Sequence, residues 1–184
     1  MKTIQVPNRD QVDAASQGIF DNLKKALGTV PNLYATIGYS SNALGAYLTY
    51  SQATDNGAFN KKEAEAIKLA VSEVNECAYC LAAHTALAKL NGFTEEETLA
   101  LRAASISDQK LKVITQLAKE IAQEKGKASE EAKQAFFEAG YDEKALIDLL
   151  AIVVDITFTN FAHRLTQVPV DFPTAKPLGT EVAV

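Results

Sequence analysis

Apolar residues recur every three or four positions along most of the chain, which is the spacing of one face of an α-helix. In residues 10–27, the apolar positions are Val12, Ile19, Phe20, Leu23 and Leu27. Apolar and polar residues do not alternate convincingly between turn residues anywhere, so strand signals are nearly absent. The pattern therefore predicts an all-α fold.

Capping residues divide this pattern into about eight to nine helices. Asn60 with Glu63 and Thr94 with Glu97 have the spacing of capping boxes, in which two side chains bond the first free amides of a helix. The expected segments are residues 10–27, a short helical turn after Pro31, and helices over 41–54, 60–74, 75–91, from Thr94 onward, 107–125, 129–139 and 143–165.

The segment 143–165 is apolar on most faces, which indicates a central or interface helix. After it, the tail 166–184 contains three prolines and is expected to be extended. No other linker or low-complexity stretch interrupts the chain. We therefore expect a single domain over residues 1–184, with a short N-terminal arm.

Composition limits the classes of function. The chain has 184 residues, of which 47% are hydrophobic and 22% charged, with a formal net charge of −5, as in ordinary globular proteins. No basic stripe appears, so a nucleic-acid partner is not expected. The N-terminus lacks the apolar run of a signal peptide, and no apolar stretch of membrane-spanning length is expected. These features predict a cytoplasmic protein without a membrane partner.

The candidate chemistry is concentrated in Cys77-Ala78-Tyr79-Cys80-Leu81-Ala82-Ala83-His84, which holds both cysteines and one of the two histidines. An α-helix turns about 100° per residue, so Cys77, Cys80 and His84 project within an arc of about 60°. Asn75 is the expected N-cap of this helix, and the helix dipole at its first turn favours thiolates. The default role for Tyr79, which lies off this stripe, is packing.

Two thiols and an imidazole on one stripe can form a redox site. If Cys80 attacks a peroxide oxygen, His84 one turn later can accept its proton or stabilise its thiolate. Cys77 can then condense with the resulting sulfenic acid to a disulfide, which an external dithiol reduces. Physical chemistry alone does not choose which carboxylate orients the histidine, and the candidates are Glu63, Glu65, Glu73 and Glu76.

Other interpretations of this motif remain open. The two thiols can be inert and buried, or they can bind zinc together with His84. The protein can also be a dithiol exchanger or redox sensor with little peroxidase turnover, or a helical oligomer with a vestigial site. A thioredoxin-like fold is not expected, because no βαβ pattern surrounds the CxxC. His163 and Asn160, near the end of the last helix, are expected to pack or hydrogen-bond there.

The spacing of Glu65, Cys77, Cys80 and His84 resembles the signature of the alkylhydroperoxidase D (AhpD)-like branch of the carboxymuconolactone decarboxylase superfamily. The likeness is specific over about 30 residues and includes the flanking residues 69–75 and 90–92. A looser likeness extends to residues 30–33 and 160–173, which resemble the peroxidase-related proteins of this superfamily.

The resemblance implies a helical AhpD-like domain that forms trimers or hexamers. It also implies a thiol-dependent peroxidase without metal or other cofactor, reduced by a lipoyl protein or a thioredoxin-like donor. In this family the residue matching Cys80 is peroxidatic and the one matching Cys77 resolves it, while those matching Glu65 and His84 form a proton relay. Tyr79 stands where the best-known members have a second histidine, which implies a shorter or water-mediated relay and weaker turnover. Decarboxylase activity is not expected, because the family's decarboxylases generally lack the CxxC.

Overall fold

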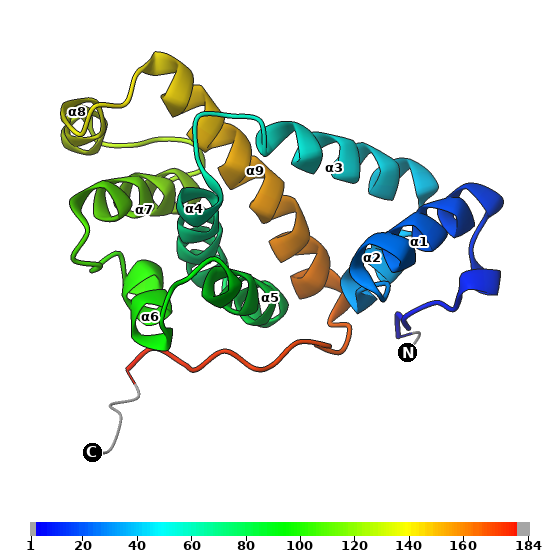
Figure 1. Cartoon of the computed structure of the whole chain (residues 1–184). Coiled ribbons are helices and arrows are strands. Elements are labelled where there is room, and N and C mark those ends of the chain that lie inside the picture. Colours follow the sequence, from blue (N-terminus) through cyan, green and yellow to red (C-terminus); the bar gives the residue numbers. More distant parts are fainter. Residues whose placement is uncertain (1–2, 180–184) are drawn as a thin grey trace.

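The computed structural model describes residues 3–179, which form one short 3₁₀-helix and nine α-helices without any strand in that range (Figure 1). The predicted all-α fold is therefore confirmed. The elements are η1 (Arg9–Gln11), α1 (Ala14–Leu27), α2 (Asn32–Ile37), α3 (Ser41–Thr54), α4 (Lys61–Val74), α5 (Ala78–Leu90), α6 (Glu95–Ala103), α7 (Gln109–Gln123), α8 (Glu130–Glu138) and α9 (Glu143–Thr166).

The helix boundaries follow local capping chemistry. The capping boxes predicted at Asn60 and Thr94 are both present, at the starts of α4 and α6. Two predicted starts were wrong by a few residues. Asp13 accepts the amide of Ser16 and begins α1 there, and Asp108 rather than Ser107 caps α7. In both cases an aspartate nearby in sequence offers a carboxylate to the free amides of the first turn.

Helix α4 lies at the centre and packs against α5, α6, α7 and α9 (Figure 1). The main core lies between α4, α7, α8 and α9, and its fully buried side chains include Ile67, Ile114, Leu117, Phe136 and Leu149. Helix α3 packs on another part of α9, with α1 and α2 beyond it. This arrangement leaves α4 and α5 facing α3 and α9 across a cavity.

Helix α9 corrects one sequence prediction. Within the described residues it is the one helix long and apolar enough to cross a membrane, whereas no such stretch was expected. Length and composition are weak evidence here, because the core helix of a soluble protein passes the same test. Helix α9 packs against α3, α4 and α7, and 44% of its most apolar stretch is buried inside the protein. The core accounts for the buried part of this apolar stretch, and the rest lies on the surface of the protein.

Candidate active site

Cys77 itself caps helix α5, which corrects the prediction that Asn75 does so. The Cys77 Sγ accepts a hydrogen bond from the backbone amide of Cys80 at 3.2 Å. Asn75 instead ends α4, and its side-chain amide donates to Asn160 Oδ1 at 2.9 Å. Cys77 is therefore held at the N-terminus of a helix, where amides and the helix dipole favour a negative charge.

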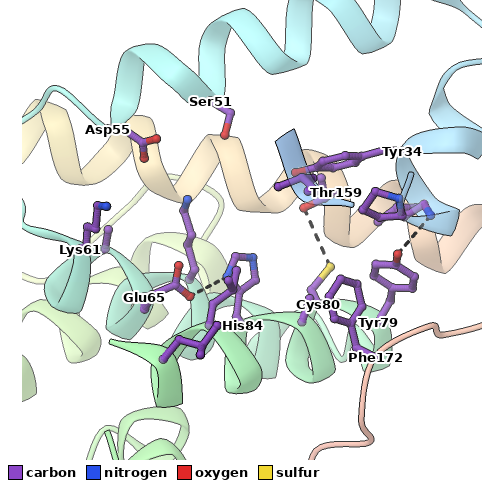
Figure 2. Close-up of a pocket in the computed structure, with 18 of the residues that line it drawn as sticks. Tyr34, Ser51, Asp55, Lys61, Glu65, Tyr79, Cys80, His84, Thr159 and Phe172 are labelled. Atoms are coloured by element: carbon purple, nitrogen blue, oxygen red, sulfur yellow. Dashed lines mark hydrogen bonds and ion pairs between the residues drawn. The ribbon is translucent and has the colours of Figure 1, made fainter. Parts of the chain in front are cut away.

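Cys80 lines the cavity from the first turn of α5, although only 3% of its surface is exposed (Figure 2). Its thiol lies 3.9 Å from the hydroxyl of Thr159 on α9. Cys77 is fully buried and is not among the residues that line the cavity. Both cysteines are free thiols. A small molecule in the cavity would therefore meet Cys80 first, with Cys77 behind it.

The two thiols influence each other's ionisation in opposite directions. The hydrogen bond from Cys80 lowers the pKa of Cys77 below its usual range, although burial opposes this, and the Cys80 amide and Asn160 lower it further. The same hydrogen bond, followed by burial and the charge of Cys77, raises the pKa of Cys80. In the dithiol form, the first proton is thus lost from Cys77, and Cys80 keeps its own. The sequence alone did not indicate which of the two cysteines loses its proton first.

The structure brings Glu65 to His84. Glu65 Oε2 lies 2.8 Å from Nδ1 of His84, and both side chains line the cavity (Figure 2). Within the described part of the chain, no hydrogen bond joins His84 to Cys80. The imidazole and the Cys80 sulfur therefore face the same cavity without a hydrogen bond between them in the described residues.

The other three candidate carboxylates have different partners. Glu63 forms the capping box at Asn60 and also accepts a hydrogen bond from a tyrosine of the α8–α9 connection. Glu73 pairs with Arg102 at 2.7 Å, and Glu76 pairs with an arginine of α9. Tertiary contacts therefore decide that Glu65, and not Glu63, Glu73 or Glu76, pairs with His84.

Thr159 of α9 is a site residue that the sequence analysis missed, whereas Asn160 makes the kind of hydrogen bonds that were expected of it. Asn160 is fully buried, donates to Ser72 Oγ at 3.1 Å, and lowers the pKa of both cysteines through hydrogen bonds. The available signal was a carboxamide in the most apolar helix of the chain, where a polar side chain needs a buried partner. His163, three residues later, packs against Tyr79 and bonds the backbone of Val168, as expected.

Tyr79 is buried and points away from the cysteine sulfurs, toward the C-terminal tail. Its hydroxyl donates to Asp171 at 2.5 Å and accepts from the amide of Leu33 at 3.3 Å. Asp171 also accepts from the amide of Asn32 at the start of α2. Burial is the main cause that raises the pKa of Tyr79. A single tyrosine thus joins α5, α2 and the tail, which passes along this side of the protein as an extended segment without regular structure (Figure 1).

The cavity has a volume of about 690 Å³, within the range of small-molecule sites. Five aromatic side chains are among the residues that line it, and they are Tyr34, Tyr47, Phe59, Tyr79 and Phe172. Among residues 3–179, no group of three or more His, Cys, Asp and Glu side chains is arranged to hold a metal ion. The site therefore combines two thiols, an imidazole–carboxylate pair and a cavity that five aromatic rings help to line.

Sequence comparison finds a family that is similar to the region around the site. Residues 42–124 match the model of the carboxymuconolactone decarboxylase family, and this region contains α4, α5 and the whole CxxC-to-histidine motif. The match covers 83 of the 184 residues, so this region of the chain is similar to the carboxymuconolactone decarboxylase family. Its fold is similar to that of AhpD-like and peroxidase-related proteins, in agreement with the resemblance seen in the sequence. No curated protein sequence matches the chain significantly.

Several solved structures share this fold at low sequence identity. The AhpD core protein of Ralstonia eutropha JMP134, a peroxidase-related protein, has a TM-score of 0.80 at 19% identity, covering 93% of this chain and 94% of its own. A peroxidase-related protein of Silicibacter sp. TM1040 has a TM-score of 0.75 at 20% identity, with 90% and 91% coverage. The debrominase Bmp8, as a variant in complex with 2,3,4-tribromopyrrole, has a TM-score of 0.77 at 16% identity, with 93% and 92% coverage.

Proposed function

We propose that the protein is a thiol-dependent peroxidase that reduces hydrogen peroxide or organic hydroperoxides through a Cys77–Cys80 dithiol–disulfide cycle. One observation carries the proposal. A cavity-facing thiol, a second free thiol that accepts a hydrogen bond from its backbone amide, and an imidazole–carboxylate pair occupy one site. The fold shared with peroxidase-related proteins supports it. The cycle uses no metal or other cofactor and takes its electrons from an external dithiol.

The chemical steps follow from the positions of the two sulfurs. Cys80 attacks the terminal oxygen of the hydroperoxide, the O–O bond breaks, and the thiol proton passes to the Cys77 thiolate. The departing alkoxide takes a proton from the His84 imidazolium. Cys77 then attacks the sulfur of the Cys80 sulfenic acid and forms the disulfide, while its proton leaves with the hydroxide as water. An external dithiol restores both thiols by exchange.

Glu65 and His84 act in this scheme on the leaving oxygen. The hydrogen bond from Nδ1 to Glu65 orients the imidazole and directs its other ring nitrogen away from the carboxylate. Because no hydrogen bond joins the described imidazole to Cys80, a water molecule or the substrate itself would carry the proton. Glu65 is therefore a positioning residue, and His84 is the general acid.

We expect His84→Ala to lower kcat/KM for peroxide about 100-fold and Glu65→Gln to lower it about tenfold, with altered pH profiles. The smaller effect arises because glutamine still accepts a hydrogen bond. Steady-state peroxide consumption with a dithiol measures both. Glu63→Gln is the matched control on the same helix and should keep full activity, because Glu63 serves the helix cap. Unchanged turnover in His84→Ala would contradict the relay. Slower alkylation of the thiols in that variant would show that His84 acts on the sulfur itself.

A dithiol exchanger or redox sensor is the main alternative function. Such a protein would form the same disulfide but would turn over slowly with peroxides and rapidly with disulfides. Rates measured with peroxide and with disulfide substrates, using lipoamide, thioredoxin and small thiols as donors, distinguish the two functions and identify the reductant class.

The aromatic cavity favours one further candidate, reductive dehalogenation of a small aromatic compound. Its support is the shared fold with a debrominase that binds a tribrominated pyrrole. In that reaction, two thiols and an aryl bromide would give the dehalogenated ring, a disulfide, bromide and a proton. Release of bromide from bromopyrroles in the presence of a dithiol tests it directly.

Self-association is also proposed. Helix α9 presents an exposed apolar stripe, whose members are spaced three or four residues apart along one face and comprise Ile147, Leu150, Val154, Phe158, Phe161 and Leu165. A contiguous apolar surface of this kind marks an interaction site on a protein. We infer that a second copy of the chain covers the stripe, in the trimer or hexamer that the family resemblance implies, in the cytoplasm.

We expect Phe161→Asp to shift the protein from oligomer to monomer, because 58% of this ring is exposed at the centre of the C-terminal half of the stripe. A charge buried in an apolar interface is unfavourable unless it is paired. Light scattering after gel filtration measures the mass. Gln116→Asp, which adds the same charge on an exposed position of α7, should leave the mass unchanged. A monomeric wild-type protein would overturn the inference.

A further inference from the structure

Lys68 is a second charged group in the cavity that the peroxidase scheme does not use. It follows Glu65 by one turn of α4 and lines the cavity, although only 9% of its surface is exposed. Its ion-pair partner among the described residues is Asp155 Oδ2, at 3.5 Å. A well-formed bond between an ammonium and a carboxylate is shorter, about 2.8 Å. The Lys68 ammonium therefore retains donors for another partner.

The carboxylate that partners Lys68 lies behind it. Asp155 is 1% exposed, does not line the cavity, and leaves its Oδ1 without a hydrogen-bond partner in the described structure. Its Oδ2 accepts a long hydrogen bond from Ser51, at 3.4 Å. The positive member of the pair thus faces the cavity and the negative member is buried. This polarity favours an anion as the ligand.

The hydroxyls around Lys68 add further polar contacts. Tyr34, Tyr47 and Ser51 all line the cavity, the two tyrosine hydroxyls interact with each other, and Tyr47 also interacts with Ser51. Figure 2 shows Tyr34 and Ser51 across the cavity from Cys80 and His84. The tyrosine rings, which lie 5.8 Å apart, form part of the aromatic wall. A flat molecule between these walls could place one end at the ammonium and the other at the sulfur.

The remaining charged groups of the cavity do not reverse this polarity. Glu65 is occupied by His84, to which it lies 2.8 Å away. Asp55 and Lys61 are exposed residues of opposite charge, and they offset each other at the edge of the cavity. Lys68 is therefore the buried charge that a ligand inside the cavity would meet.

We infer that Lys68, with the neighbouring hydroxyls, is a binding subsite for the carboxylate of a planar aromatic substrate whose reacting group lies at Cys80. The cavity supports this class, because about 690 Å³ is far more space than hydrogen peroxide needs. The inference deepens the proposed function, since the reacting group of such a substrate would be a hydroperoxide. The subsite itself can be tested without any reaction.

The binding test uses the reduced wild-type protein and two probes of the same size, 2-naphthoate and 2-naphthamide, in isothermal titration calorimetry. We expect the carboxylate to bind about tenfold more tightly than the amide, which corresponds to one charged hydrogen bond. Lys68→Met should abolish that preference. Lys62→Met should keep it, because Lys62 is an exposed lysine of the same helix that lies over the Phe93 ring. Equal binding of the two probes to the wild type would overturn the inference.

Two further variants exclude an effect of misfolding. Lys68→Met leaves Asp155 without its partner, so Lys68→Met combined with Asp155→Asn provides a neutral pair that should fold and still lack the preference. Asp155→Asn alone should increase affinity for 2-naphthoate several-fold, because the ammonium no longer shares its charge with a carboxylate. A purely structural ion pair would give weaker binding or no change in that variant, which would contradict the subsite.

Kinetics separate this inference from the peroxidase proposal. A hydroperoxide that carries an aromatic carboxylate should have a kcat/KM about tenfold higher than its neutral amide, and Lys68→Met should remove the difference through KM. If neither hydroperoxide is consumed but 2-naphthoate binding depends on Lys68, the peroxidase proposal fails and the subsite stands. If both are consumed equally, the peroxidase stands and this substrate class fails.

Discussion

Replacement of Cys80 by serine should lower peroxide consumption about 1,000-fold or more when a dithiol supplies the electrons. Cys80 is the thiol that lines the cavity, and a serine hydroxyl neither ionises near neutral pH nor accepts an oxygen atom from a peroxide. The serine side chain is close in size, and it can still donate to Thr159 or to Cys77. The loss would therefore reflect chemistry rather than folding.

Two measurements make this result decisive. Circular dichroism should show unchanged helix content in Cys80→Ser. The control Ser107→Ala removes the hydroxyl of an exposed serine that does not cap α7, and it should keep wild-type activity. Full peroxide consumption by Cys80→Ser would eliminate the proposed mechanism, whatever the behaviour of the other variants.

Cys77→Ser should fail in a different way. The cavity-facing Cys80 can still be oxidised once, but no second thiol remains to displace water from its sulfenic acid. We expect stoichiometric peroxide loss without turnover, followed by over-oxidation of Cys80. Mass spectrometry measures this as a gain of one and then more oxygen atoms. In the wild type, mild peroxide should instead remove two daltons as the two cysteines join. Sustained turnover by Cys77→Ser would exclude Cys77 as the resolving thiol.

The same pair of variants tests the order of ionisation. The pKa of Cys77 is lowered first by its hydrogen bond from Cys80, so one thiolate should form in the wild type below the usual thiol range. The second thiolate should form only at much higher pH, because the pKa of Cys80 is raised. Absorbance near 240 nm follows both steps. Cys80→Ala should raise the first pKa, whereas Cys77→Ser should lower that of Cys80. A wild-type titration in which both thiols ionise together would contradict this order.

Most of the helical framework was predictable because local chemistry determines it. The apolar spacing and the capping boxes at Asn60 and Thr94 act over three or four residues, and both are visible in the sequence. The cap at Cys77 was missed because thiols rank low among N-caps, and the nearby Asn75 is a residue type that caps well. That asparagine instead bonds Asn160, which lies 85 positions away in the sequence.

The sequence predicted which residues could form the site, but it did not predict the contacts between their side chains. The shared face of Cys80 and His84 follows from the helical period, but Cys77 caps the helix and lies behind them, and the partner of the histidine depends on how α4 packs on α5. Glu73, one of the four carboxylates that could have paired with His84, pairs instead with Arg102, 29 positions away in the sequence. No rule based on neighbouring residues predicts that contact. The ion pair of Lys68 with Asp155 likewise joins α4 to α9 and is invisible to helical periodicity.

In the proposed disulfide cycle, the position of Cys77 as the N-cap of α5 would link redox state to helix stability. In the dithiol form, the Cys77 sulfur accepts a hydrogen bond from the backbone amide of Cys80. A disulfide sulfur carries no charge and is a poorer hydrogen-bond acceptor. Each catalytic cycle would therefore weaken the hydrogen bond at the start of this helix on oxidation and restore it on reduction. Amide hydrogen exchange at Cys80 would then report the oxidation state, and a reductant that favours the loosened turn could recognise the spent enzyme.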